Sequence, residues 1–91
     1  MKPTVENVPQ QQRFEVRVDA DLARLDYRVQ GGVMTLVHTE VPPALEGRGI
    51  AGALVQTALD HAGVQKLKVD PVCSYARSYI ERHPESRALL S

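Results

Sequence analysis

The hydrophobic and polar positions of the chain follow two different periods. From Phe14 to Val18 apolar residues take alternate positions, as on a strand with one buried face. The alternation is weaker from Leu22 to Gln30 and returns from Val33 to Val41. The Gly31-Gly32 pair between these last two runs is typical of a tight hairpin turn. The pattern therefore predicts three consecutive antiparallel strands.

The third expected strand, Val33 to Val41, divides its side chains between two faces of the sheet, because successive strand residues point to opposite sides. One face is expected to carry Met34, Leu36, His38 and Glu40. The other is expected to carry Val33, Thr35, Val37, Thr39 and Val41. His38 and Glu40 would then be close enough for one side chain to orient the other.

A helical period replaces the alternation after Arg48. Apolar residues recur three and four positions apart there, so that one stripe faces the sheet. They are Ala51, Leu54, Val55, Ala58, Leu59 and Ala62. Gly63 is the expected C-terminal cap. Lys66 to Val69 predicts a fourth strand, which a crossover helix places parallel to the third. A second short helix is predicted around Tyr75 to Ile80 and stops before Pro84.

Composition limits what else the chain can contain. Met1 to Gln12 lacks a period and is expected to be a flexible lead-in, which leaves residues 13–91 as a single domain. Eleven basic and eleven acidic residues cancel without forming a stripe, so neither nucleic acid nor a membrane is expected as a partner. A single cysteine and the lack of a long apolar segment favour a cytoplasmic protein. No metal site is expected, since no cluster has metal-ligand spacing.

A glycine-containing turn joins the third strand to the first helix, and it reads Glu46-Gly47-Arg48-Gly49-Ile50-Ala51-Gly52. The first N–H groups of a helix have no internal partner and lie at the positive end of its dipole. Glycines at this point allow a ligand to approach the backbone closely. The turn therefore predicts a phosphate-binding site, and the alternative is that its glycines only form a tight connection.

Three motifs, taken in this order, carry a resemblance to a known family. They are His38-Thr39-Glu40-Val41-Pro42, Glu46-Gly47-Arg48-Gly49-Ile50-Ala51 and Pro71-Val72-Cys73-Ser74-Tyr75. The chain resembles the small, truncated branch of the GCN5-related N-acetyltransferase family, roughly from Phe14 to Pro84. The resemblance implies a mixed α/β (α+β) fold, in which antiparallel β-β-β is followed by α-β-α with a parallel fourth strand.

The resemblance also implies acetyl-CoA as the cofactor, with its pyrophosphate at the glycine turn. The residues expected to contact it are Val41, Gly47, Arg48, Gly49, Ile50, Ala51, Gly52 and Tyr75. In the family signature Gln or Arg usually stands where this chain has Glu46, and a carboxylate repels a pyrophosphate unless it points away. Arg48 can compensate, because a guanidinium binds phosphate with two hydrogen bonds.

Cys73, His38 and Glu40 are the candidate catalytic residues. Cys73 precedes the second predicted helix, where free N–H groups stabilise a thiolate, although a lone cysteine is more often a small buried apolar residue. The resemblance places it near the acetyl thioester, where it would either accept the acetyl group or protonate the departing CoA sulfur. His38 is the candidate base for the acceptor amine or for Cys73. Glu40 is a further candidate base, which requires a raised pKa near neutrality.

Together with these residues, the resemblance implies an N-acetyltransferase that moves an acetyl group from acetyl-CoA to an amine. The alternative is a CoA- or acyl-CoA-binding module without turnover, a sensor or an interaction protein. So short a chain has no room for extra walls around the acceptor, so the acceptor site should be open or completed by a second subunit. We therefore expect a monomer or a homodimer, and an open site suits an amine on a protein.

Overall fold

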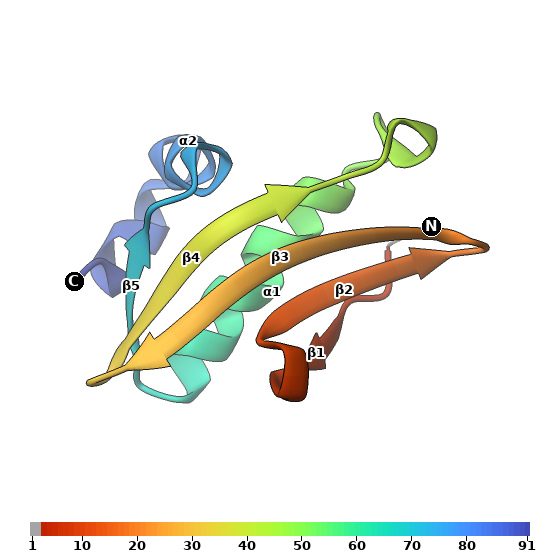
Figure 1. Cartoon of the computed structure of the whole chain (residues 1–91). Coiled ribbons are helices and arrows are strands. Elements are labelled where there is room, and N and C mark those ends of the chain that lie inside the picture. Colours follow the sequence, from red (N-terminus) through yellow and green to blue (C-terminus); the bar gives the residue numbers. More distant parts are fainter. Residues whose placement is uncertain (1–2) are drawn as a thin grey trace.

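The computed structural model describes residues 3–91, which form a five-stranded sheet with helices packed against it (Figure 1). The elements are β1 Glu6–Val8, β2 Arg13–Val18, β3 Asp21–Gln30, β4 Val33–Glu40, α1 Ile50–Val64, β5 Lys68–Pro71 and α2 Ser74–Arg82. Short 3-10 turns occupy Pro9–Gln11, Pro43–Leu45 and Pro84–Leu89. The predicted mixed α/β fold is confirmed, with the antiparallel strands first and the parallel strand after α1.

The strands lie in sequence order, β1-β2-β3-β4-β5, and β5 runs parallel to β4. The Gly31-Gly32 hairpin is confirmed: both residues have positive φ, +58° and +77°, a conformation that favours glycine. Strand β5 pairs with β4 only from Val33 to Leu36, whereas β4 continues to Glu40. Beyond Leu36 and Pro71 the two strands no longer pair, and the chain after β5 leads away from β4 into α2 (Figure 1).

Helix α1 covers one face of the sheet and builds the core with it. Its predicted apolar stripe is buried from Leu54 to Ala62, and Ile50 joins it. The sheet contributes Phe14, Val16, Ala23, Leu25, Tyr27, Met34 and Leu36. Burying one such large side chain contributes about 1.5–3 kcal/mol, so this layer supplies most of the driving force for folding. In Figure 1, α1 runs behind the sheet and no described helix lies in front of β2, β3 and β4.

The N-terminal segment is more regular than its sequence predicts. Strand β1 pairs antiparallel with β2, with Asn7 opposite Phe14, and the Tyr27 hydroxyl donates a hydrogen bond of 2.7 Å to Asn7 Oδ1. Regular structure therefore begins at Glu6, within the segment that was expected to be a lead-in. A three-residue strand is too short for alternation to reveal it. The rest of the expected lead-in includes Met1 and Lys2, which lie outside the described residues.

A β-bulge changes the facing of side chains in the second half of β4. Tyr27 pairs with Leu36 and Asp26 with His38, so Val37 is an extra residue without a partner on β3. Leu36 is buried on the α1 face, whereas His38 is exposed on the opposite face. The prediction that Met34, Leu36, His38 and Glu40 share one face is therefore wrong beyond Leu36. Glu40 lies with His38 on the face of the sheet opposite α1, which we call the helix-free face. Thr39 lies on the α1 face.

The first helix ends later than predicted. Helix α1 continues through Gly63 to Val64, so Gly63 is not its cap. Lys66 instead adopts the left-handed conformation, with φ +58°, and its N–H donates to the Gly63 carbonyl at 3.2 Å. Among residues 3–91, no helix has both the length and the apolar character needed to cross a membrane.

Candidate functional site

The N-terminus of α1 borders a cavity of about 240 Å³, which we call the glycine cavity. Its lining residues are Val41, Leu45, Glu46, Gly47, Gly49, Ile50, Ala51, Gly52 and Tyr75. The first intrahelical hydrogen bond of α1 runs from Ala53 N–H to the Gly49 carbonyl, and no side chain of the described residues 3–91 caps the helix. The N–H groups of Ile50, Ala51 and Gly52 are therefore left for a ligand, at the positive end of the helix dipole. This arrangement can hold a phosphate or pyrophosphate.

The turn before α1 depends on two glycines with left-handed backbone. Gly47 has φ +79°, and Gly49, the N-terminal cap residue, has φ +74°. A Cβ atom on either residue would meet no atom of the described part of the chain within 4 Å. The protein therefore needs glycine here for its backbone conformation and not because a neighbour fills the space. The open space above the turn lets a ligand approach the backbone.

Tyr75 brings helix α2 to the same cavity. Its hydroxyl lies 3.5 Å from the position of a Cβ on Gly52, so a larger residue at position 52 would touch the tyrosine. Val41, just beyond β4, lines the cavity from the sheet side. Seven of the eight predicted cofactor residues thus line one cavity. Whether they bind a cofactor stays a prediction.

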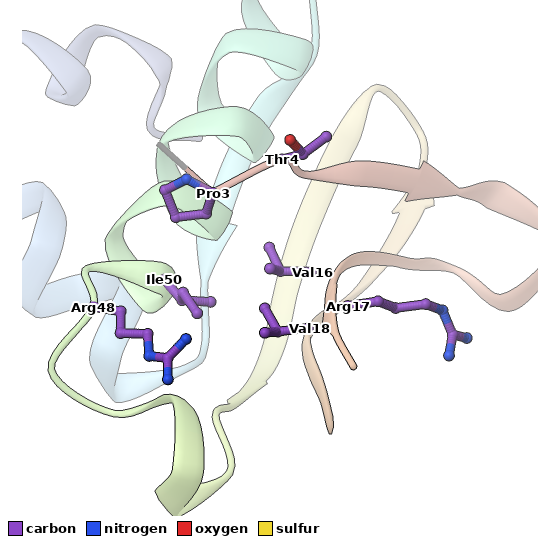
Figure 2. Close-up of a pocket in the computed structure, with 7 residues that line it drawn as sticks. All are labelled: Pro3, Thr4, Val16, Arg17, Val18, Arg48 and Ile50. Carbon is purple, nitrogen blue, oxygen red and sulfur yellow. The ribbon is translucent and has the colours of Figure 1, made fainter. Parts of the chain in front are cut away.

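The eighth, Arg48, lines a different cavity of about 390 Å³. Arg48 and Ile50 lie on one side of that cavity and Val16 and Val18 on the other, while the Arg17 guanidinium points away (Figure 2). In this arrangement Arg48 does not lie in the glycine cavity, and the backbone N–H groups are the donors there. Glu46 does line the glycine cavity, although its side chain is exposed.

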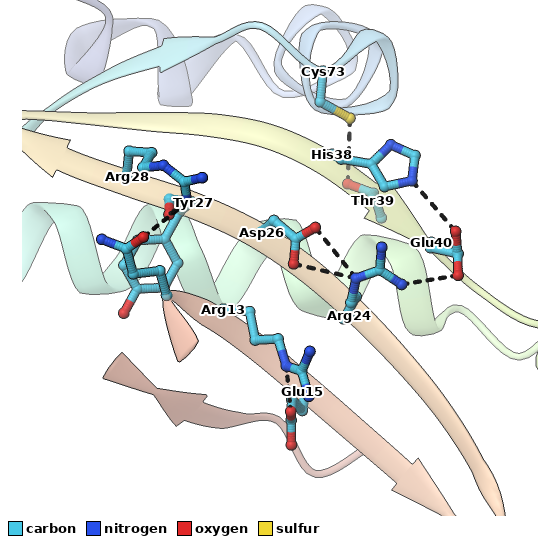
Figure 3. Close-up of polar contacts among 11 residues, drawn as sticks. Arg13, Glu15, Arg24, Asp26, Tyr27, Arg28, His38, Thr39, Glu40 and Cys73 are labelled. Carbon is cyan, nitrogen blue, oxygen red and sulfur yellow. Dashed lines mark hydrogen bonds and ion pairs between the residues drawn. The ribbon is translucent and has the colours of Figure 1, made fainter. Parts of the chain in front are cut away.

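Cys73 lies just beyond the point where β4 and β5 cease to pair, as the N-terminal cap residue of α2. Its N–H donates to the Leu36 carbonyl at 2.9 Å, which attaches it to the last paired position of β4. Its Sγ lies 3.3 Å from Thr39 Oγ1, on the part of β4 that β5 no longer pairs (Figure 3). The cysteine is partly buried and is not disulfide-bonded.

Two opposing effects set the pKa of the Cys73 thiol. Burial disfavours the thiolate and by itself raises the pKa. Hydrogen bonds from the Thr39 hydroxyl and from the N–H groups of Ala76, Tyr75 and Thr39 favour the thiolate and together outweigh burial, so the pKa lies below its ordinary value. A lowered pKa increases the thiolate fraction, which is the nucleophilic form.

His38 and Glu40 form a pair on the opposite side of β4 from Thr39. His38 Nε2 lies 3.5 Å from Glu40 Oε1, and Arg24 Nη1 donates to Glu40 Oε2 at 2.8 Å (Figure 3). The hydrogen bonds from Arg24 and His38 hold the pKa of Glu40 below its usual range. Glu40 is therefore a poor proton acceptor near neutrality, contrary to its candidate role as a base. Among residues 3–91, Cys73 and His38 do not hydrogen-bond to each other.

Thr39 and Arg24 contact candidate residues but carry no separate signal in the sequence. Thr39 was expected only as one residue of a strand face, and its contact with Cys73 joins residues 34 positions apart. Arg24 reaches Glu40 across 16 positions. Alternation could not show either contact, because both depend on the register after the bulge. Within residues 3–91, no three His, Cys, Asp or Glu side chains gather closely enough to hold a metal ion.

Known proteins match this chain over most of its length. The profile of the GCN5-related N-acetyl-transferase family matches residues 13–89. Protein NATD1 of Mus musculus is 40% identical over 83 residues, which span 88% of this chain and 76% of that protein. Protein NATD1 of Danio rerio is 33% identical over 88 residues, which span 93% of this chain and 80% of that protein.

A solved structure supports the fold independently. The solution structure of a GCN5-like protein from Staphylococcus aureus superposes with a TM-score of 0.76 at 24% sequence identity. The match covers 97% of this chain and 87% of that one. Sequence and fold therefore agree, and the chain belongs to the GCN5-related N-acetyltransferase family.

Proposed function

We propose that the chain is an acetyl-CoA-dependent N-acetyltransferase that uses Cys73 in the transfer. The observation that carries the proposal is the position of Cys73. It lies just beyond the point where β4 and β5 cease to pair, and it directly precedes α2, whose Tyr75 lines the glycine cavity. The glycine cavity would therefore hold the anionic part of the cofactor, while the Cys73 thiol lies near Tyr75 at the start of α2. Family membership supports acetyl transfer as the chemistry.

The residues present fit an elongated thioester with a pyrophosphate group. The uncapped N–H groups of Ile50, Ala51 and Gly52 would bind the pyrophosphate, and the open space above Gly47 and Gly49 admits it. Val41 and Tyr75 would flank the arm that leads from the phosphates toward Cys73. Bound acetyl-CoA supplies an activated acetyl group as a thioester.

Backbone groups of β4 would polarise the acyl carbonyl. Beyond Leu36 the edge of β4 that faces β5 has no strand partner among residues 3–91, while β4 still pairs with β3. Fixed N–H donors at such an edge stabilise the negative charge that develops on the carbonyl oxygen during acyl transfer. Removing one donor of this kind in other enzymes lowers the rate by about 10²–10³-fold.

Cys73 would act as the acyl acceptor in the first half of the reaction. Its lowered pKa and its hydrogen bonds from Thr39 and the start of α2 favour the thiolate. The thiolate sulfur forms a bond to the acetyl carbon, and the bond from that carbon to the CoA sulfur breaks. The acceptor amine would then attack the acetyl carbon, and the bond from that carbon to Cys73 Sγ would break, which returns the Cys73 thiolate. The proton of the amine would pass to His38, which lies on the accessible face of β4.

Intact mass spectrometry after brief exposure to acetyl-CoA tests the covalent route. Native protein is expected to gain one acetyl group, and Cys73→Ser is expected to gain none. Because Cys73 is the only cysteine in the chain, a thiol adduct has a single possible position. Urea-unfolded native protein is the control for random acylation, since unfolding removes the contacts of Thr39 and α2 with the thiol.

Release of free CoA with trial amines tests turnover in parallel. His38→Ala is expected to keep the adduct and to lose turnover by about 10²-fold, because a general base contributes roughly that much. If native protein forms no adduct but still releases CoA with an amine, Cys73 acts instead as the acid for the departing CoA sulfur. If it does neither, transfer is excluded.

A CoA-binding module without turnover is the second candidate. One observation favours it: Glu46 lines the glycine cavity, where a carboxylate opposes an anionic ligand and reduces the fit to a standard cofactor site. Calorimetry with CoA distinguishes the two functions. Tight binding without adduct or CoA release supports the module, and Glu46→Gln is expected to tighten binding in either case.

A further inference from the structure

Four charged or titratable side chains form a line across β3 and β4 on the helix-free face of the sheet (Figure 3). Arg24 Nε donates to both carboxylate oxygens of Asp26, each at 3.2 Å, and its Nη1 donates to Glu40 Oε2 at 2.8 Å. Glu40 Oε1 in turn lies 3.5 Å from His38 Nε2. Glu40 thus divides its two oxygens between an arginine and a histidine.

The β-bulge makes this line possible. After it, Arg24 lies opposite Glu40 and Asp26 opposite His38, so all four side chains share one face. Without the extra residue Val37, His38 and Glu40 would point to the α1 face, away from Arg24. The bulge therefore places His38 and Glu40 on the same face as Arg24.

The two ends of the line differ in exposure. The side chains of Arg24 and Asp26 are each 27% exposed, whereas those of His38 and Glu40 are 53% and 56% exposed. Arg24 is held by Asp26 at the protected end, and the open end presents His38 to incoming molecules. Ion pairs at such exposed positions contribute little to stability, so fold stability does not account for the arrangement.

We propose that Arg24 is a positioning residue for acetyl transfer. Arg24 fixes Glu40, Glu40 accepts a hydrogen bond from Nε2–H of His38, and Nδ1 of His38 is thereby left as the proton acceptor. This inference rests on the proposed function. It adds that Nδ1 of His38 accepts the proton and that Arg24, through Glu40, orients the imidazole ring. Neither Arg24 nor Asp26 was expected from the sequence.

The proton balance of the step follows from this geometry. The attacking amine passes its proton to Nδ1, and His38 becomes an imidazolium with both nitrogens protonated. The carboxylate of Glu40 then balances the new charge through Nε2–H. Arg24 and His38 keep the pKa of Glu40 low, so Glu40 stays ionised and does not take the proton itself.

Three variants at two arginines test the role. Arg24→Gln removes the donor to Glu40, and Arg24→Lys keeps the charge. Arg28→Gln is the matched control. Arg28 lies on the same strand and face, and within residues 3–91 its side chain donates only to Gln12 Oε1 and the Tyr27 carbonyl. Each variant is assayed for kcat, for KM toward acetyl-CoA and for the pH dependence of kcat. The carboxyl carbon of Glu40 is titrated by NMR.

Arg24→Gln is expected to lower kcat about tenfold, to leave KM for acetyl-CoA unchanged and to raise the pKa of Glu40. Arg24→Lys should recover part of kcat, and Arg28→Gln should match the native protein throughout. If Arg24→Gln raises the pKa of Glu40 but keeps the native kcat and pH profile, the positioning role is wrong while the proposed function stands. If native protein transfers acetyl to no amine, the proposed function fails first, before any variant is compared.

Discussion

Thr39 Oγ1 lies 3.3 Å from Cys73 Sγ and connects the part of β4 that β5 no longer pairs to the start of α2. The contact lies on the α1 side of β4, whereas His38, the preceding residue, points to the other side. The hydroxyl can donate to a thiolate and thereby favours the charged form of the sulfur. The lowered pKa of the Cys73 thiol thus comes from Thr39 and from backbone N–H groups. In the proposed reaction, this would leave His38 for the acceptor amine.

Thr39→Val should make Cys73 less reactive at neutral pH. The valine keeps the shape of threonine but cannot donate, while burial continues to raise the thiol pKa. Because only the thiolate is alkylated, the pH profile of iodoacetamide alkylation should shift to the alkaline side. At pH 7 the rate should fall about 3- to 10-fold, as expected for one lost hydrogen bond. Thr39→Ser, which keeps the hydroxyl, is the control, and an equal loss there would assign the effect to packing.

Gly49→Ala should lower both stability and affinity for CoA. An L-residue in the left-handed conformation at φ +74° costs about 1–2 kcal/mol, and nothing near its Cβ adds to that cost. The new methyl group would also occupy the open space above the helix start. Urea unfolding gives the first effect and calorimetry with CoA the second. Gly49→Asn should cost less stability, because asparagine tolerates this backbone; equal costs would contradict the left-handed backbone as the cause.

Truncation to alanine should lower the free energy of unfolding strongly at Leu36 and only slightly at its neighbour Val37. Leu36 is completely buried, and its truncation to alanine should cost about 2–5 kcal/mol, which is a large part of the stability of a small domain. Val37 is the bulge residue and is 39% exposed, so Val37→Ala should cost at most about 0.5 kcal/mol. Chemical denaturation of both variants measures the difference. Similar losses of stability in the two variants would contradict Val37 as the bulge residue.

The sequence predicts those parts of this fold that depend on local pattern. The alternation of β2, the Gly31-Gly32 hairpin and the stripe of α1 follow from periods of two and 3.6 residues, and the structure confirms them. The glycine turn is equally local, and the cavity at its helix end contains seven of the eight residues assigned to it. Such features need only nearby residues.

What the sequence does not predict depends on register. Alternation places His38 on the face of Leu36, but one extra residue at Val37 reverses the facing of everything after it. No residue type marks that bulge. The partners Arg24 for Glu40 and Thr39 for Cys73 follow from the same register, so they could not be predicted either. Strand β1 is missed because three residues hold no period.

Gly52→Ala should separate binding from stability. Gly52 lies in the first turn of α1 with helical backbone, and an added Cβ would make ordinary contacts with Tyr75 Oη at 3.5 Å and Tyr79 Cε2 at 3.6 Å. Alanine favours the helix over glycine by about 0.8–1 kcal/mol, so the variant should be at least as stable as the native protein. Its methyl group would enter the glycine cavity, and affinity for CoA should fall about tenfold or more.

Gly63→Ala is the matched control, because it makes the same change in the same helix. Gly63 is exposed near the far end of α1, and among residues 3–91 no atom lies within 4 Å of the position that a Cβ would take. This variant should gain up to about 1 kcal/mol of stability in urea unfolding and should bind CoA as the native protein does. If both variants bind CoA equally well, CoA does not occupy the cavity at the start of α1. If only Gly52→Ala loses affinity while it stays folded, the phosphate groups lie against the first turn of the helix.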